Sequence, residues 1–104
     1  MIKPNKIKIG NLTYTVKELP PPAPMEVSNK GIILYREQEL YLDSGVSHEA
    51  LRECLLHEIL HGILVQGGFE KETDDDKLVC TLSNGIFQVF IDNPELLSFI
   101  WEKK

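Results

Sequence analysis

The chain has 104 residues, of which 42% are hydrophobic and 26% are charged, and its net charge is −5 at pH 7. This size and composition predict one small globular domain that spans residues 1–104. Residues 1–46 carry 6 basic and 5 acidic side chains, whereas residues 47–104 carry 5 basic and 11 acidic ones. A basic surface that would bind nucleic acid is not indicated, and no stretch reaches the roughly 18 apolar residues of a membrane span. We therefore expect neither nucleic acid nor a membrane as a partner.

The cysteines and the N-terminus indicate the compartment. The chain contains only two cysteines, Cys54 and Cys80, which is fewer than a small disulfide-held secreted domain usually carries. The first residues, MIKPNKIKIG, lack the apolar segment of a signal peptide. These features predict a cytoplasmic protein.

The first half of the chain has the alternation of short strands. Residues 1–18 alternate apolar and polar side chains on both sides of the Gly10-Asn11 turn, which predicts two strands. The proline-rich residues 19–27 predict an extended connection. Residues 31–36 and 39–43 alternate again, and they predict a hairpin with a polar turn between its strands.

The second half has helical periodicity. Ser47 is a suitable N-cap for a helix whose apolar residues run from Ala50 to Val65, and Gly67-Gly68 ends the pattern. Because apolar residues cover most of its circumference, we expect this helix at the centre of the fold. A second helix is predicted over about 75–92, and a short third one with Asn93 as its cap. Four strands followed by three helices predict an α+β fold, with a short antiparallel sheet packed on the central helix and two C-terminal helices.

The central helix contains the sequence HEILH at residues 57–61. His57 and His61 are four residues apart, so both imidazoles lie on one face of a helix and can bind a single zinc ion. Glu58 lies about 100° further round the helix, beside the ion rather than on it, where it can accept a proton from a bound water. This is the H-E-x-x-H arrangement of zinc metallopeptidases. A histidine in an apolar helix is more often a core residue, but three ionisable groups within five residues favour a Zn²⁺ site over that alternative.

A catalytic zinc site usually has three protein ligands, so a third is expected from the next helix. Helical geometry brings Asp76 close to the apolar side of that helix, whereas Asp75 stands at its start and Asp74 points away. Our order of preference is Asp76, then Asp75, then Glu72; the alternative for such an acidic run is a solvated helix N-terminus. The acidic residues considered are Glu70, Glu72, Asp74, Asp75 and Asp76.

The two cysteines, the remaining histidine His48, and two of the tyrosines can also be assigned from the sequence. Cys54 lies one turn before His57, and we interpret it as a small buried residue below the site rather than as a ligand. Cys80 is likewise interpreted as a core residue, and His48 as an exposed one. Tyr35 and Tyr41 are candidates for an oxyanion donor, although both also suit simple strand positions.

The motif HEILHGI follows a hairpin that ends in YLDSGVS and precedes the helix KLVCTLSNGIFQVFIDNPEL. From Gly31 to Leu97 the chain resembles the small phage and prophage members of the ImmA/IrrE-type zinc metallopeptidases, a zincin-like family. In that family the second helix carries an acidic ligand in a pattern like E-x-x-A-x-x-F-A, which falls here on Asp76, Val79, Leu82 and Ser83. The resemblance therefore implies His57, His61 and Asp76 as metal ligands, with Asp in place of Glu, and Glu58 as the catalytic base.

Motif and resemblance together predict a zinc-dependent endopeptidase that cleaves a protein or peptide through zinc-bound water activated by Glu58. By resemblance, a phage regulatory protein is the expected substrate. The strand at Glu39–Asp43 is expected to form the sheet edge beside the cleft, where a substrate could add as a further strand. The alternative functions are a zincin-like module that binds metal and acts by contacting a partner without proteolysis, and a domain in which HEILH is incidental.

Overall fold

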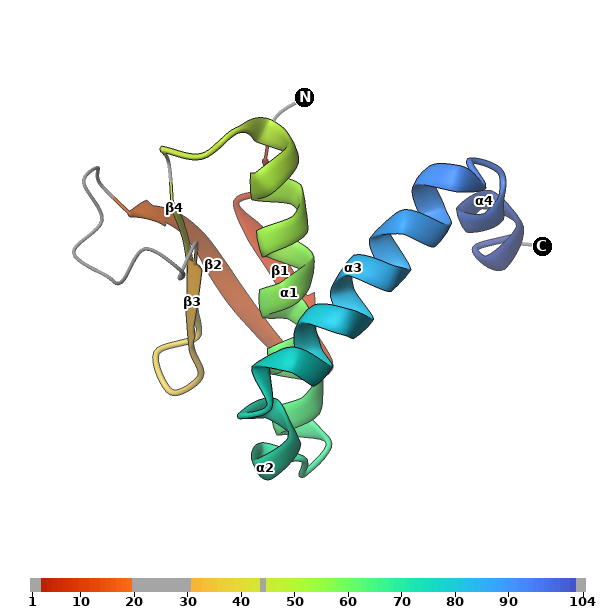
Figure 1. The fold of residues 1–104 in the computed structure, drawn as a ribbon. Coiled ribbons are helices and arrows are strands. Elements are labelled where there is room, and N and C mark those ends of the chain that lie inside the picture. The colour runs from red at the N-terminus through yellow and green to blue at the C-terminus, as the bar shows by residue number, and fades with distance from the viewer. Residues whose placement is uncertain (1–2, 20–30, 44, 103–104) are drawn as a thin grey trace.

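The computed structural model describes residues 3–19, 31–43 and 45–102. Within these residues the chain forms four strands and four helices, which confirms the predicted α+β class (Figure 1). Of the predicted proline-rich connection at 19–27, residues 20–27 lie outside the described part of the chain. None of the described helices is long and apolar enough to cross a membrane.

The sheet is mixed rather than antiparallel, and its strand order is β1-β2-β4-β3. Strands β1 (Lys6–Ile9) and β2 (Leu12–Leu19) pair antiparallel through a turn in which Gly10 has a φ of +60°, a value that glycine adopts without strain. Strands β3 (Gly31–Leu34) and β4 (Glu39–Asp43) form the second antiparallel pair. The prediction of an antiparallel sheet is wrong at one place, because β2 and β4 run parallel. Local alternation predicts strands but does not identify their partners, and the long connection from β2 to β3 permits a parallel pairing.

One face of the sheet carries the core, and α1 (His48–Gln66) packs against it. Tyr14, Leu40 and Leu42 are almost completely buried there. Gly62 on α1 allows the helix to lie close to the sheet, because a Cβ atom at this position would lie 3.0 Å from Cδ1 of Ile9. The buried cluster consists of Ile9, Tyr14, Val16, Ile33, Leu40, Leu42 and Cys54.

Helix α1 lies between the sheet and α3, so its predicted central position is confirmed (Figure 1). The Ser47 hydroxyl accepts a hydrogen bond from the Ala50 amide, and Gly67 is the C-cap, as predicted. The helix is nevertheless less enclosed than its apolar sequence indicates. Its only buried residues among those described are Cys54, Glu58 and Gly62, and Ile63 is exposed.

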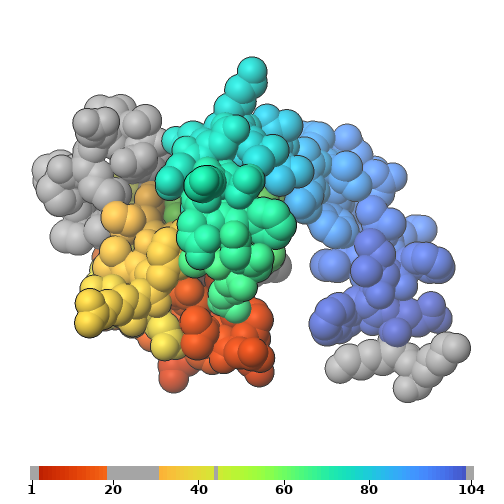
Figure 2. Space-filling view, turned by 90° about the horizontal axis from the view of Figure 1, so that it is seen from below, coloured from red at the N-terminus to blue at the C-terminus, as the bar shows by residue number. Residues whose placement is uncertain are grey.

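Three further helices follow α1. The short α2 (Glu70–Thr73) was not predicted, α3 covers Asp76–Asp92, and α4 covers Leu96–Ile100. Asn93 was expected to cap the last helix at its N-terminus. It instead ends α3, where its side-chain amide donates a hydrogen bond to the Val89 carbonyl. The first half of α3 crosses α1, while its second half and α4 project away from the sheet (Figures 1 and 2).

Candidate metal centre

Helix α1 brings His57 and His61 together as their spacing predicts. Both imidazoles are half-buried, and their Nε2 atoms lie 3.0 Å apart. The two rings are nearly perpendicular, with an interplanar angle of 75° and centroids 4.6 Å apart. Two nitrogens at zinc–nitrogen distances on a tetrahedral ion would lie about 3.3 Å apart. The observed pair is therefore close to the geometry of two ligands on one cation.

Asp76 joins this pair from the first turn of α3. Its carboxylate is exposed, and the ligand atoms of His57, His61 and Asp76 all lie within 4.8 Å of one another. Among the described residues this is the one group of three or more such side chains that could hold a metal ion. The structure thus brings together the three predicted ligands.

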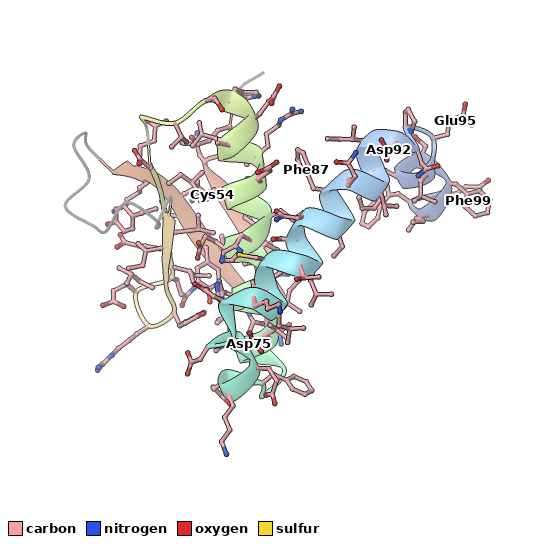
Figure 3. The ribbon with its side chains drawn as sticks, viewed as in Figure 1. Cys54, Asp75, Phe87, Asp92, Glu95 and Phe99 are labelled. Atoms are coloured by element: carbon pink, nitrogen blue, oxygen red, sulfur yellow. The ribbon has the colours of Figure 1, made fainter. Side chains whose placement is uncertain are left out.

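The neighbouring acidic residues have other positions. The Asp75 side chain caps α3 by accepting a hydrogen bond of 3.1 Å from the Leu78 amide, and Figure 3 shows it at the start of that helix. Asp74 is the C-cap residue of α2. Glu70 and Glu72 lie on α2, and both are exposed. None of these four belongs to the group formed by the two histidines and Asp76.

The protonation state of the histidines suits metal binding. Burial lowers the pKa of His57, and the nearby Asp76 carboxylate offsets this only in part. Burial, and then the neighbouring His57, lower the pKa of His61. Both rings are therefore neutral near pH 7, and a neutral imidazole has the lone pair that a metal requires. Two imidazoles and one carboxylate form a donor set that zinc accepts and that leaves a fourth position open.

Thr73 is a site residue that the sequence did not reveal. It is buried at the end of α2, and its Oγ1 lies 2.6 Å from Nδ1 of His61. When the Nδ1–H of His61 donates to this hydroxyl, its Nε2 carries the lone pair, on the side that faces Nε2 of His57. A partner of this kind fixes both the tautomer and the orientation of a ligating histidine. A threonine within the polar run EKETDDD gives no sequence signal for this role, which depends on the position of α2.

The sequence predicted that both cysteines are buried, and the structure confirms this for only one of them. Cys54 is buried in the core below the site, as predicted, on the sheet side of α1 (Figure 3). The interpretation of Cys80 as a core residue is wrong, because its side chain is exposed and its Sγ lies 3.7 Å from Nδ1 of His57. Cys80 is one helical turn beyond Asp76, on the side of α3 that faces the site. Burial raises the pKa of its thiol, with the Asp76 carboxylate as a second cause.

Glu58, which the motif predicts as a base, is a buried residue of α1. Its side chain is only 6% exposed, and burial, followed by the nearby Asp76 carboxylate, raises its pKa to about 7. The ion pair found among the described residues is formed elsewhere, between Lys17 and Glu39. No described basic side chain therefore compensates Glu58, which makes the site more favourable for a cation.

These side chains line a cleft of about 460 Å³ between α1, α3 and β3. Gly31, Ile32 and Ile33 of β3 form one wall. The expectation that Glu39–Asp43 forms the edge beside the cleft is wrong, because β4 lies between β2 and β3, and the edge strand that lines the cleft is β3. A hairpin alone does not determine which of its strands pairs further into a sheet.

The two candidate tyrosines lie in different places. Tyr35, in the turn after β3, lines the cleft, and burial raises the pKa of its hydroxyl although a hydrogen bond with Thr73 acts against this. The Tyr41 hydroxyl instead donates to Glu39, which does not line the cleft. His48 is exposed at the start of α1, as predicted.

No protein-family model, curated protein or solved structure matches this chain.

Proposed function

We propose that this protein is a zinc-dependent endopeptidase. The observation that carries the proposal is the convergence of two neutral imidazoles, a carboxylate and a buried glutamate on one cleft. The histidine Nε2 atoms are 3.0 Å apart, Asp76 is within 4.8 Å of them, and Glu58 lines the same cleft with a pKa of about 7. Structural zinc sites usually have four protein ligands, whereas three ligands and an open position are typical of catalytic ones.

Each residue has a distinct task in this proposal. His57, His61 and Asp76 hold the ion, and Thr73 fixes the ring of His61. A zinc ion bound there would polarise a substrate carbonyl and make a water molecule more acidic. Glu58 accepts a proton from the water molecule that attacks the peptide carbonyl and returns it to the leaving amine, acting first as a general base and then as a general acid.

The cleft suits an extended peptide as substrate. Strand β3 is one of the two edge strands of the described sheet, and it forms a wall of the cleft together with α1 and α3. A substrate segment that pairs with β3 would lie in the cleft that Glu58 also lines. Tyr35 lines the same cleft and could donate a hydrogen bond to the carbonyl oxygen under attack. The resemblance to ImmA/IrrE-type peptidases supports a cytoplasmic regulatory protein, such as a phage repressor, as the natural substrate.

Metal analysis of the purified protein tests the site. We expect one zinc per chain in the wild type and in His48→Ala, and almost none in His61→Ala. His48 is the matched control, because it lies on the same helix but outside the cleft. Equal metal content in all three proteins would rule out the proposed ligands.

Proteolysis is tested separately with Glu58→Gln. A mixed peptide library, analysed by mass spectrometry for new termini, serves as substrate because the natural one is unidentified. The wild type should produce new termini, whereas Glu58→Gln should keep its zinc and lose at least about 100-fold in rate, as expected for a general base. If the wild type binds zinc but neither protein cleaves any peptide, the alternative of a metal-binding module that acts by contact is favoured.

A further inference from the structure

Helices α3 and α4 expose large apolar side chains that no other part of the described chain covers. We define the outer stripe of α3 as Leu78, Leu82 and Val89, which are 38–47% exposed. We define the α4 cluster as Leu97, Phe99, Ile100 and Trp101, which are 57–75% exposed. No residue of α4 is buried. Figure 3 shows Phe99 pointing away from the body of the molecule, and Figure 2 shows α4 separated from the strands.

The outer stripe is distinct from the side of α3 that contacts α1. Val79 and Ser83 are buried, and Phe87 lies over the Arg52 guanidinium of α1 at 5.5 Å, so these residues mark the inner side. At 100° per residue, Leu82 and Val89 lie about 60–80° from Val79 and well over 100° from Phe87. The outer stripe is therefore a second apolar side of α3, which α1 does not cover.

The sequence of α3 has two features that favour contact with another helix along this second side. From Leu78 to Ile91 it contains no Asp, Glu, Lys, Arg or His over 14 residues. Residues 78, 82, 85 and 89 follow the 4-3-4 spacing with which helices pack side by side. Charge depletion combined with exposed apolar side chains is characteristic of the centre of a protein interface rather than of free surface.

Gly85 marks the middle of this side. A shallow groove is formed there by Thr81, Leu82, Gly85, Ile86, Val89 and Phe90. A Cβ atom at Gly85 would meet nothing within 4 Å, so the packing of this chain gives no reason for glycine at the centre of a helix. Glycine is less favourable there than alanine, and its absent side chain lets another helix approach closely.

The amount of apolar surface fits one type of partner. The exposed parts of the outer stripe and the α4 cluster together amount to roughly 700–800 Å². It matches the roughly 800 Å² that each partner contributes to a standard protein–protein interface. The second half of α3 and α4 form a projecting arm, and this arm carries both the groove around Gly85 and the exposed Phe99 and Trp101. A surface with both a recess and protrusions can pair with itself about a two-fold axis.

We propose that the outer stripe of α3 and the α4 cluster form a homodimer interface, whose occupant is the same surface of a second copy of this chain. The inner side of α3 remains packed on α1 and keeps Asp76 and Cys80 at the metal centre. Dimerisation is therefore independent of the metal ligands.

Sedimentation velocity from about 1 µM to about 500 µM tests the proposal. We expect conversion from one chain of 11.9 kDa to two as concentration rises, and the same conversion in His61→Ala. Trp101 is the single tryptophan and is 70% exposed in the isolated chain, so its fluorescence should shift to shorter wavelength over the same concentration range. A single chain at every concentration, with unchanged emission, would overturn the proposal and leave a different protein as the occupant of this surface.

A pair of variants tests the location of the interface. Val89→Glu places a charge in the outer stripe and should weaken dimerisation by about 100-fold or more. Ile91→Glu is the matched control, because Ile91 is 49% exposed against 47% for Val89 but points about 160° away on the helix. It should change the dissociation constant by less than about threefold. Equal effects of the two substitutions, or no effect of Val89→Glu, would place the contact elsewhere and contradict the proposal; circular dichroism of both variants establishes that they are folded.

Discussion

At the scale of single residues, burial in the cleft favours the neutral forms of His57, His61 and Glu58. Burial is the main cause of the lowered pKa values of His57 and His61 and of the raised pKa of Glu58. Asp76 lines the same cleft and is exposed. A divalent cation would use the neutral imidazoles as donors and would favour ionised Glu58. The same burial that is unfavourable for charge in the metal-free protein therefore favours metal binding.

Thr73 tests whether the orientation of His61 matters. Thr73→Val keeps the shape of the side chain but removes the oxygen that lies 2.6 Å from Nδ1 of His61. We expect zinc affinity to fall by about 10–100-fold, as is typical when the outer partner of a ligating histidine is lost. Competition with a chromogenic chelator measures this affinity. Thr73→Ser retains the hydroxyl and should bind zinc within about threefold of the wild type, so equal affinities for Val and wild type would exclude this role.

Glu58 makes the stability of the metal-free protein depend on pH. Its folded-state pKa, about 7, lies above the ordinary value of 4.5, so folding retains a proton that the unfolded chain releases. The contribution of this carboxyl is complete below about pH 4.5 and is lost as pH rises through about 7; a shift of this size corresponds to about 3 kcal/mol. The lowered pKa values of the two histidines act in the opposite sense over part of this range. A comparison between variants is therefore needed to isolate Glu58.

Urea unfolding of Glu58→Gln in the presence of a chelator makes this comparison. Relative to the variant, the wild type should lose about 3 kcal/mol between pH 4.5 and pH 8. Glu53→Gln, at an exposed position on the same helix, should keep the wild-type dependence. A constant difference between wild type and Glu58→Gln across this range would show that Glu58 titrates normally.

At the scale of elements, the site depends on how closely α1 approaches the sheet and on where α2 and α3 meet it. Gly62 follows His61 directly and faces Ile9 and Ile33 across the core. The turn after α1 leads into α2, which brings Thr73 to His61, and the Asp75 cap starts α3 so that Asp76 faces the histidines. Small changes in the depth of α1 would therefore move both His57 and His61 relative to Asp76.

Gly62→Leu tests this close approach. A Cβ at this position would already lie 3.0 Å from Ile9 Cδ1 and 3.3 Å from Ile33 Cδ1, so a leucine side chain has no space without moving the helix. We expect a loss of about 2–3 kcal/mol in the free energy of unfolding, measured with urea. Gly62→Ala adds one methyl group against two flexible side-chain ends and gains helix propensity, so it should stay within about 1 kcal/mol of the wild type. Equal stability of the leucine and alanine variants would mean that the space exists.

The elements show which features a sequence can predict. HEILH identified His57, Glu58 and His61 because a helix fixes the relation between residues one turn apart, whatever surrounds it. Helical geometry also favoured Asp76, which lies beside the apolar stripe of its helix, and Asp75 was ranked second because it stands at the start of that helix. Thr73 and Cys80 were missed because each reaches its histidine from another helix, at a separation of 12 and 23 residues. Contacts of that kind depend on tertiary packing rather than on periodicity.

The fold also has features that a local sequence pattern predicts and features that depend on tertiary packing. Alternation predicted all four strands, and caps predicted both ends of α1. The parallel pairing of β2 with β4 and the edge position of β3 were not predictable, because strand partners are chosen by packing across the whole sheet. Helix α3 is apolar on more than one side, but only its inner side is covered. The excess apolar surface belongs to an interface that one chain alone does not complete.

At the scale of the whole molecule, the metal centre would act as a link between two parts of the fold. His57 and His61 belong to α1, which is packed on the sheet, whereas Asp76 begins α3, which leads to the projecting arm. A cation held by all three side chains would tie the start of α3 to α1 at His57 and His61. An ion that binds only the folded chain also stabilises it by mass action.

Thermal unfolding with and without zinc tests this link. Free zinc at 100 times its dissociation constant should add about 2.7 kcal/mol to the free energy of unfolding, which for a domain of this size raises Tm by roughly 10–20 °C. Excess chelator should return Tm to the metal-free value. His48→Ala retains all three ligands and should show the full shift, whereas His61→Ala should show less than about a quarter of it, since a two-ligand site binds zinc weakly. If zinc raised Tm equally in both variants, the stabilising ion would be bound outside the cleft.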